Sequence, residues 1–282
     1  MLKNTFCHVP GIGARSEHTL WSSGIRSWDN LTDTAHTPLS PKKIRDLAER
    51  IRQSTLHLRN NNPGYFSRLL PSHHIWRLFP EFRHSTAYLD IETTGLFGRG
   101  ARITTIALYD GRSISWYVRG RNLKDFKRDI RKYKVIVTFN GRGFDIPFIE
   151  GELGIRMNHT HIDLKYVLRS LGYTGGLKRC EKMLGLERGE LDGLDGFFAV
   201  LLWNDFKKNR NPKALETLLA YNIQDTVNLE TLMVIAYNMK LMETPFAKSH
   251  ELPMPLVPEN PFRPDTETIR RIISETSCFF SA

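Results

Sequence analysis

The chain has 282 residues, 40% of them hydrophobic, and a formal net charge of +10, which fits a globular protein with either one large domain or one domain with substantial extensions. The basic excess favours a polyanionic partner, nucleic acid first and an anionic membrane surface second, although solubility alone also explains it. Three scattered cysteines without a C-x-x-C pair argue against a zinc cluster or a disulfide framework. No signal-peptide core or membrane-length apolar run occurs, so we expect a cytoplasmic protein rather than a membrane protein.

Residues 1–84 are expected to form a mostly helical extension. The turn "HVPGIG" precedes a short helix over residues 14–24, and a second helix fits residues 40–53, with Ser40 as its cap and Pro41 in its first turn. The glycine-rich turn resembles the hairpin of helix-hairpin-helix modules, whose N–H groups bind DNA phosphate. A plain turn leading into a helix is the alternative.

After residue 84, β-rich runs alternate with helical segments. Strands are expected over residues 86–92, 102–109, 112–120, 134–140 and 159–164, the second and third joined at the hairpin signal Asp110-Gly111. Helices are expected over residues 122–133, 165–172, 175–185, 194–208 and 213–239. This alternation predicts an α/β fold, a mixed central sheet of about five strands flanked by helices.

The last part of the chain, from about residue 242, is proline-rich and reads "ETPFAKSHELPMPLVPENPFRPD". Such a composition predicts an extended tail rather than a domain. We therefore divide the chain into an N-terminal extension, residues 1–84, a central domain, residues 85–241, and a C-terminal tail, residues 242–282.

Two carboxylates stand at the end of the first expected strand, in "DIETTG". Acidic residues are poor strand formers and costly to bury, yet Asp90 and Glu92 share one face of this strand, about 7 Å apart along it. An Asp-x-Glu triplet alone occurs about once by chance in a chain of this size. The pair therefore indicates a site only if other acidic residues join it.

Two other segments place acid near the core. "VIVTFNGRGFDIPF" puts Asp145 five residues past a buried strand, after glycines that permit a tight turn. In "LAYNIQDTVNLE", Asp225 lies in the apolar stripe of the long helix, and Tyr221 lies one turn before it on the same face. If these acids converge with Asp90 and Glu92, two divalent cations, Mg²⁺ or Mn²⁺, would relieve their repulsion and could cleave phosphodiesters.

Together, "DIETTG", "NGRGFD" and "YNIQD" resemble the three motifs of the DEDD 3′–5′ exonucleases of the ribonuclease-H-like superfamily, in the tyrosine-containing DEDDy branch, which includes the editing domains of family B DNA polymerases. The layout is most similar to the YprB-like predicted bacterial exonucleases. The resemblance spans roughly residues 85–240, the ordinary size of one domain. Each motif alone is weak, whereas their order and spacing together are specific.

The resemblance implies a role for each matching residue. The metal ligands would be Asp90, Glu92, Asp145 and Asp225. Tyr221 would orient the attacking water as a protonated phenol. Residues of the motifs that flank the acids would contact substrate, namely Thr93, Gly95, Leu96, Asn140 and Phe144.

The sequence thus favours a two-metal 3′–5′ exonuclease that releases 5′-mononucleotides from single-stranded DNA or RNA. An endonuclease of the same fold that cuts RNA or structured DNA is the first alternative. A non-catalytic nucleic-acid-binding protein is the second, and the presence of all four acids and the tyrosine disfavours it. Protein partners are not indicated by any motif.

Overall fold

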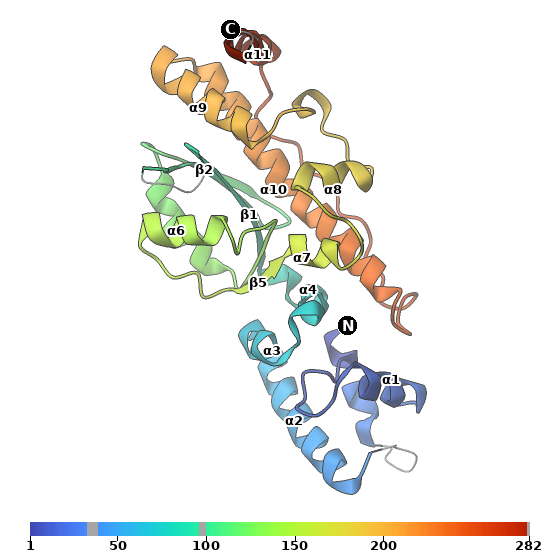
Figure 1. Ribbon diagram of the computed structural model, residues 1–282. Helices are drawn as coiled ribbons and strands as arrows, with labels where there is room; N and C mark the ends of the chain where they lie inside the picture. Colours follow the sequence, from blue (N-terminus) through green and yellow to red (C-terminus); the bar gives the residue numbers. More distant parts are fainter. Residues whose placement is uncertain (33–38, 96–99, 281–282) are drawn as a thin grey trace.

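The computed structural model describes residues 1–32, 39–95 and 100–280, and a mixed sheet lies at its centre (Figure 1). The sheet has five strands in the order β3-β2-β1-β4-β5. The strands are β1 (Thr86–Thr93), β2 (Ile103–Tyr109), β3 (Ile114–Val118), β4 (Val135–Thr138) and β5 (Thr160–Asp163). β1 pairs antiparallel with β2 and parallel with β4, which confirms the predicted mixed sheet.

The hairpin between β2 and β3 forms where the sequence predicts it. Gly111 has φ +85°, a conformation that glycine adopts at little cost. The carboxylate of Asp110 accepts hydrogen bonds from the backbone N–H groups of Arg112 and Ser113, at 3.0 and 2.8 Å. An aspartate and a glycine at these two positions therefore fix the turn.

Helices cover both faces of the sheet, because successive side chains of β1 point to opposite sides. Ala87, Leu89 and Ile91 pack against α5 (Phe126–Asp129) and α6 (Asp145–Leu153), whereas Tyr88 faces the core that includes α7 (Leu164–Arg169) and α10 (Pro212–Leu241). Figure 1 shows α6 on one side of the sheet and α10 on the other. The helices of the central domain are α5 (Phe126–Asp129), α6 (Asp145–Leu153), α7 (Leu164–Arg169), α8 (Leu177–Met183), α9 (Gly196–Asn209) and α10 (Pro212–Leu241).

Two predictions for this domain were inaccurate. The regular helix expected over residues 122–133 is a series of short turns, in which only Phe126–Asp129 is α-helical. Helix α6 was not predicted, because its amphipathic pattern is weak and it follows a glycine-rich turn. It begins at Asp145, a candidate metal ligand.

The N-terminal region, residues 1–84, is helical, as predicted. Its α-helices are α1 (Ala14–Ser22), α2 (Pro41–Arg59), α3 (Pro63–Leu69) and α4 (Phe79–Phe82). Ser40 caps α2 by accepting a hydrogen bond from the N–H of Lys43, and Pro41 occupies the first turn, as expected. DNA binding by the "HVPGIG" turn stays a prediction.

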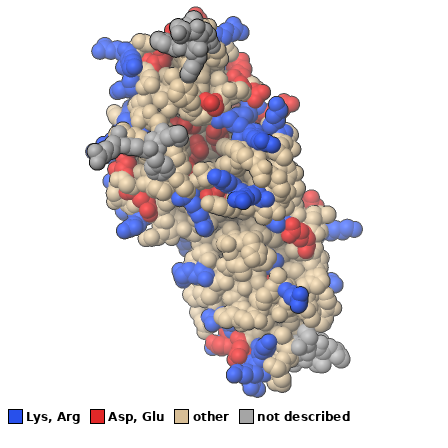
Figure 2. Space-filling view, in the orientation of Figure 1, with Lys and Arg blue, Asp and Glu red and all other residues tan. Residues whose placement is uncertain are grey.

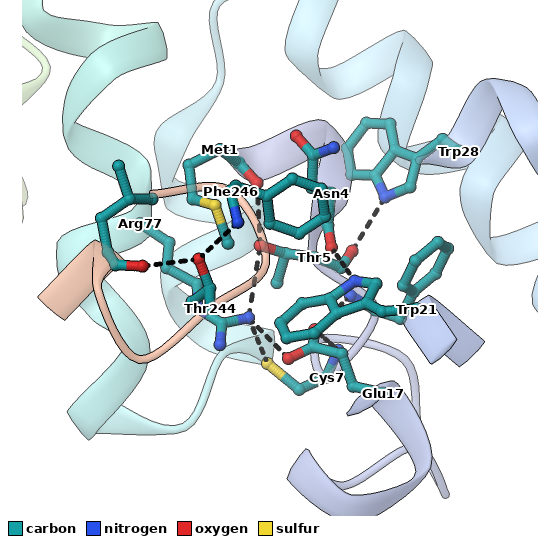
Figure 3. Close-up of polar contacts among 12 residues, drawn as sticks. Met1, Asn4, Thr5, Cys7, Glu17, Trp21, Trp28, Arg77, Thr244 and Phe246 are labelled. Atoms are coloured by element: carbon teal, nitrogen blue, oxygen red, sulfur yellow. Dashed lines mark hydrogen bonds and ion pairs between the residues drawn. The ribbon is translucent and has the colours of Figure 1, made fainter. Parts of the chain in front are cut away.

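A buried ion pair ties the start of the chain to the segment before the sheet (Figure 3). The guanidinium of Arg77 lies 2.7 Å from the Glu17 carboxylate, and both side chains are almost fully buried. Glu17 also accepts hydrogen bonds from the N–H groups of Phe6 and Cys7, at 2.6 and 3.0 Å. These bonds compensate the cost of burying the charges.

The C-terminal segment runs back along α10 and ends in a helix that was not predicted, α11 (Thr266–Phe280) (Figure 1). Side chains of α10 hold it: Asn238 accepts a hydrogen bond from the N–H of Leu252 at 2.9 Å, and Thr217 accepts one from the N–H of Asp265. Just beyond the C-terminal end of α10, Phe246 packs edge-on against Trp21 at 5.3 Å (Figure 3). Both ends of α10 are therefore braced.

No helix in the described part of the chain combines the length and apolar composition that a membrane crossing requires.

The buried pair gives a stability prediction. Arg77→Met leaves Glu17 buried without its counter-charge, so the free energy of unfolding should fall by about 3–5 kcal/mol. Arg52→Met is the matched control, since Arg52 pairs with Glu49 on an exposed helix face. It should cost less than about 1 kcal/mol in urea unfolding. Equal losses in both variants would contradict this account.

Candidate active site

Three carboxylates from two elements meet at the centre of the molecule. Asp90 and Glu92 come from β1 and Asp225 from α10, and ligand oxygens of all three lie within 4.8 Å of one another. Glu92 and Asp225 are buried, and Asp90 is partly exposed. Two of these residues are separated from the third by more than 130 positions, so the fold itself assembles the cluster.

The orientation of Asp90 and Glu92 is set by the register of β1 and by hydrogen bonds to neighbouring side chains. The register of the β1–β2 pair shifts between Glu92 and Thr93, an irregularity of the kind that re-aims side chains beside active sites. On α10, the amide of Asn222 donates a hydrogen bond to Asp90 Oδ2 at 2.7 Å. The same Asn222 accepts one from the hydroxyl of Thr105 on β2, at 3.0 Å. Asp90 is thus held against the helix that supplies Asp225.

Asp145 lies beside this cluster but is not within the group of three. Its Oδ1 accepts a hydrogen bond from the N–H of Ile91 at 3.2 Å, beyond the part of β1 that pairs with β4. The carboxylate therefore satisfies a backbone group that the sheet leaves unpaired. Burial raises the pKa of Asp145 to about 7, despite the opposing effect of these backbone hydrogen bonds.

The turn before Asp145 depends on a glycine. A side chain at Gly141 would place its Cβ 2.2 Å from the hydroxyl oxygen of Thr138, which no real contact allows. Asp163, at the end of β5, accepts hydrogen bonds from the N–H groups of Asn140 and Arg142, at 2.8 and 3.1 Å. It also caps α7 by accepting a hydrogen bond from the N–H of Lys165. This acid holds the turn next to the site.

Tyr221 is buried one turn before Asp225, as predicted from the stripe on α10. The ammonium of Lys178 donates a hydrogen bond to its hydroxyl and lies 3.6 Å from Asp225 Oδ2. Burial, with the charges of Asp225, Glu92 and Asp90, raises the pKa of Tyr221 far above its usual range. The phenol therefore keeps its proton.

Sequence reasoning missed a buried partner of Asp225. Arg188 contacts Asp225 Oδ1 and lies 2.7 Å from the Glu181 carboxylate. Glu181 in turn accepts a hydrogen bond from the amide of Asn228 at 2.7 Å. Arg188 lies in a loop after α8, so no periodicity in the sequence links it to α10.

The electrostatics of the site favour bound cations. Burial raises the pKa values of Asp90 and Glu92 well above normal, and their neighbouring carboxylates raise them further. Lys178 and Arg188 offset part of this negative charge, chiefly at Asp225. Oxygen ligands of this density are the donor set that Mg²⁺ and Mn²⁺ prefer. The residues present therefore fit divalent metal ions.

The surface of the molecule is hollowed where acidic and basic side chains meet (Figure 2). Figure 2 shows Asp and Glu atoms in this recess, with Lys and Arg atoms beside it. A cavity of about 660 Å³ borders the site and is lined by Asn140, Lys165, Arg169, Tyr173 and Leu177, among others. Leu177 precedes Lys178 on α8, and Lys178 contacts Tyr221 and Asp225, so the cavity lies one residue along this helix from a side chain of the site.

Where the structure describes them, the residues predicted to contact substrate have different surroundings. Thr93 and Gly95 follow Glu92 at the end of β1, where the Thr93 hydroxyl donates to the Gly95 carbonyl at 2.6 Å. Leu96 lies outside the described residues. Asn140 lines the cavity and accepts a hydrogen bond from Lys165 at 2.8 Å. Phe144 packs against Phe148, with ring centroids 5.0 Å apart.

Comparison with known proteins agrees with this geometry. A family model of the RNase H superfamily matches residues 87–237, more than half of the chain.

The chain belongs to the ribonuclease H superfamily.

Members of this superfamily with nuclease activity use divalent metals at acidic clusters, and the buried acids here fit that use. The matched region contains all four acids and the tyrosine. It excludes the whole N-terminal region, residues 1–84, and the C-terminal segment from residue 242.

Among solved structures, the family B DNA polymerase of the hyperthermophilic archaeon Pyrobaculum calidifontis matches with a TM-score of 0.42 and 17% identity. The match covers 56% of this chain and 24% of the polymerase chain, so this protein corresponds to about a quarter of that enzyme's length. At this score the match adds nothing to the assignment. No curated protein matches the chain.

The crowded acids give a prediction about metal and stability. Asp90→Asn removes one charge from the cluster, so the melting temperature in chelator should rise, because repulsion falls. In Mn²⁺ at about 100 times its Kd, the parent protein should gain about 2.7 kcal/mol, and the variant should gain much less.

Asp46→Asn is the control, since Asp46 is exposed on α2. It should respond to Mn²⁺ as the parent protein does, in thermal unfolding followed by circular dichroism. If Asp90→Asn kept the full Mn²⁺ response, Asp90 would not be a ligand.

Proposed function

We propose that this protein is a metal-dependent 3′–5′ exonuclease of the DEDDy type, similar to the YprB-like predicted exonucleases. It hydrolyses terminal phosphodiesters of single-stranded DNA or RNA and releases 5′-mononucleotides. The observation that carries the proposal is the meeting of Asp90, Glu92 and Asp225, with ligand atoms within 4.8 Å of one another. Membership of the ribonuclease H superfamily supports phosphodiester chemistry at this site.

The metal ligands of the proposal are the four acids. Asp90, Glu92 and Asp225 provide converging oxygens, and Asp145 contributes the oxygen that does not bind the N–H of Ile91. Two bound Mg²⁺ or Mn²⁺ ions would activate a water molecule and stabilise charge on the leaving oxygen. Asn222 keeps Asp90 in place, and Arg188 keeps Asp225 in place.

Tyr221 positions the attacking water in this proposal. Its raised pKa makes it a poor general base, so its contribution is a hydrogen bond. Because Lys178 already donates to the phenol oxygen, the hydroxyl proton is free to bond to water or to a phosphate oxygen. This arrangement explains why a protonated tyrosine stands beside Asp225.

The cavity of about 660 Å³ beside the acids suits a single strand. Lys165 and Arg169 supply positive charge for phosphates, and Phe139 and Tyr173 offer aromatic rings for bases. Stacking of a base on an aromatic ring contributes about 1–3 kcal/mol and tolerates any sequence. Bases can stack in this way only when they are unpaired, which supports a single-stranded substrate.

The acids give the principal activity prediction. In Mg²⁺ or Mn²⁺, the pure protein should release mononucleotides from the 3′ end of a 5′-labelled oligonucleotide, and chelator should abolish this. Asp90→Asn and Asp225→Asn should each lower kcat by about a thousand-fold or more, since each removes a metal ligand. Tyr221→Phe should lower it by about ten- to a hundred-fold.

Product length and mutant behaviour separate the alternatives. Discrete internal fragments would indicate an endonuclease of the same fold. Binding in chelator without cleavage in Mn²⁺ would indicate a non-catalytic protein. Asp46→Asn serves again as a control and should leave kcat unchanged. Full activity in Asp90→Asn and Asp225→Asn would refute the site assignment.

The strand cavity gives a separate kinetic prediction. Arg169→Ala removes a cation from the cavity but not from the acid cluster, so KM for single-stranded oligonucleotides should rise about three- to ten-fold with kcat nearly unchanged. Lys124→Ala, an exposed residue outside this cavity, is the matched control and should change neither constant. A fall in kcat with unchanged KM would contradict a binding role.

A further inference from the structure

A second basic cavity lies at the opposite end of the sheet from the acids. It has a volume of about 670 Å³, and its lining includes Lys134 and Thr160. Lys134 immediately precedes β4 and Thr160 begins β5, whereas Asn140 and Asp163 of the candidate active site lie at or beyond the other ends of these strands. The two cavities are therefore separated by the length of the parallel strands.

The charges of this cavity are of one sign. Four cationic side chains line it, from Arg68, Arg131, Lys134 and Arg156. Its described lining contains no Asp or Glu. Among the residues that the structure describes, none of the four forms an ion pair with a carboxylate. Like charges gathered in one concavity repel one another unless an anion joins them.

The N-terminal region and the central domain build this cavity together. Asn60, Asn61 and Asn62 follow α2, and Arg68 lies on α3. Lys134 donates a hydrogen bond to the backbone carbonyl of Asn61 at 2.7 Å, which fixes the two parts against each other. The three asparagines add amide groups to the cationic wall. A part of the chain outside the superfamily match thereby contributes to a concave basic surface.

We propose that this cavity binds the sugar–phosphate backbone of the nucleic acid whose 3′ end occupies the acid site. The choice of ligand rests on the proposed function, whereas the cavity and its charge do not. Exposed arginines and asparagines contact phosphates without reading bases. The N-terminal region is thereby assigned a role as part of a strand-holding surface.

The spacing sets a minimum length for a strand that uses both sites. Thr86 pairs with Val135 beside this cavity, and Glu92 lies six residues further along β1, a separation of about 20 Å at 3.3 Å per residue. Successive phosphates of one strand are about 3.4 Å apart along a duplex and farther apart when the strand is extended. An oligonucleotide of about 3 nucleotides reaches only the acid site, whereas one of about 15 reaches both.

The test compares two variants of the full chain. Arg131→Ala/Arg156→Ala removes two cavity cations that have exposed side chains, and Lys207→Ala/Lys208→Ala removes two exposed cations from the end of α9. Both variants lose the same charge. Binding of fluorescent single strands of about 3 and about 15 nucleotides is measured by anisotropy in chelator, over a range of salt concentrations.

The cavity variant should bind the longer strand about ten-fold more weakly than the parent protein. Its slope of log affinity against log salt should fall by about 1.4, since each single-strand phosphate contact contributes about 0.7. Affinity for the short strand should be unchanged, and the α9 variant should match the parent on both. Arg68→Ala should reproduce part of the loss and so report the contribution of the N-terminal region.

Three outcomes would overturn the proposal. The cavity variant could match the α9 variant, it could lose affinity equally for both lengths, or a mononucleotide could displace the longer strand from the parent but not from the cavity variant. The last would make the cavity a nucleotide site. Binding is measured without metal, so it does not depend on cleavage. If the protein cleaved no substrate but the cavity variant still lost affinity only for the longer strand, the proposed function would be wrong and this inference would hold.

Discussion

The molecule is organised around the repulsion among carboxylates that β1 and α10 bring together. Asp90 and Glu92 are fixed by the strand, and Asp225 is fixed by the helix, so none of them can move far from the others. Two protein cations and several hydrogen bonds offset part of the charge, through Lys178 and Arg188. The remaining excess is tolerable only when protons or metal ions are bound. Keeping such a cluster buried therefore lowers the stability of the metal-free protein.

Contacts around α10 offset the destabilisation that the buried carboxylates cause. Its C-terminal end packs against the N-terminal region, where Tyr237 meets Trp76 at 5.5 Å. Along its length, the C-terminal segment hydrogen-bonds to polar side chains that would otherwise face solvent. Arg83 and Glu230 join the helix to the start of the sheet at 2.7 Å. The extensions therefore hold rigid the element that carries Asp225 and Tyr221.

The acids on β1 and α10 could be predicted from the sequence, because each stands out against the local pattern of its own element. Asp90 and Glu92 interrupt a strand, and Asp225 interrupts the apolar stripe of a helix, so each violates the rule of its own element. Arg188 and Glu181 could not be found in this way, because they lie in or near a loop and their partners are distant in sequence. Asp145 was predicted to follow a tight turn, but the helix that it begins was not predicted, and only tertiary contact reveals its bond to Ile91.

The same division applies to the fold. The mixed sheet could be predicted from the alternation of β-rich and helical segments and from one turn signal. Helices α6 and α11 were missed, because the pattern of α6 is weak and a proline-rich stretch precedes α11.

The most direct test of the central claim is a crystal structure of the protein in saturating Mn²⁺, with the anomalous signal collected. We expect two manganese peaks among Asp90, Glu92 and Asp225, with Lys178 displaced from Asp225. A map without manganese at these carboxylates, with Lys178 and Arg188 still on Asp225, would contradict it.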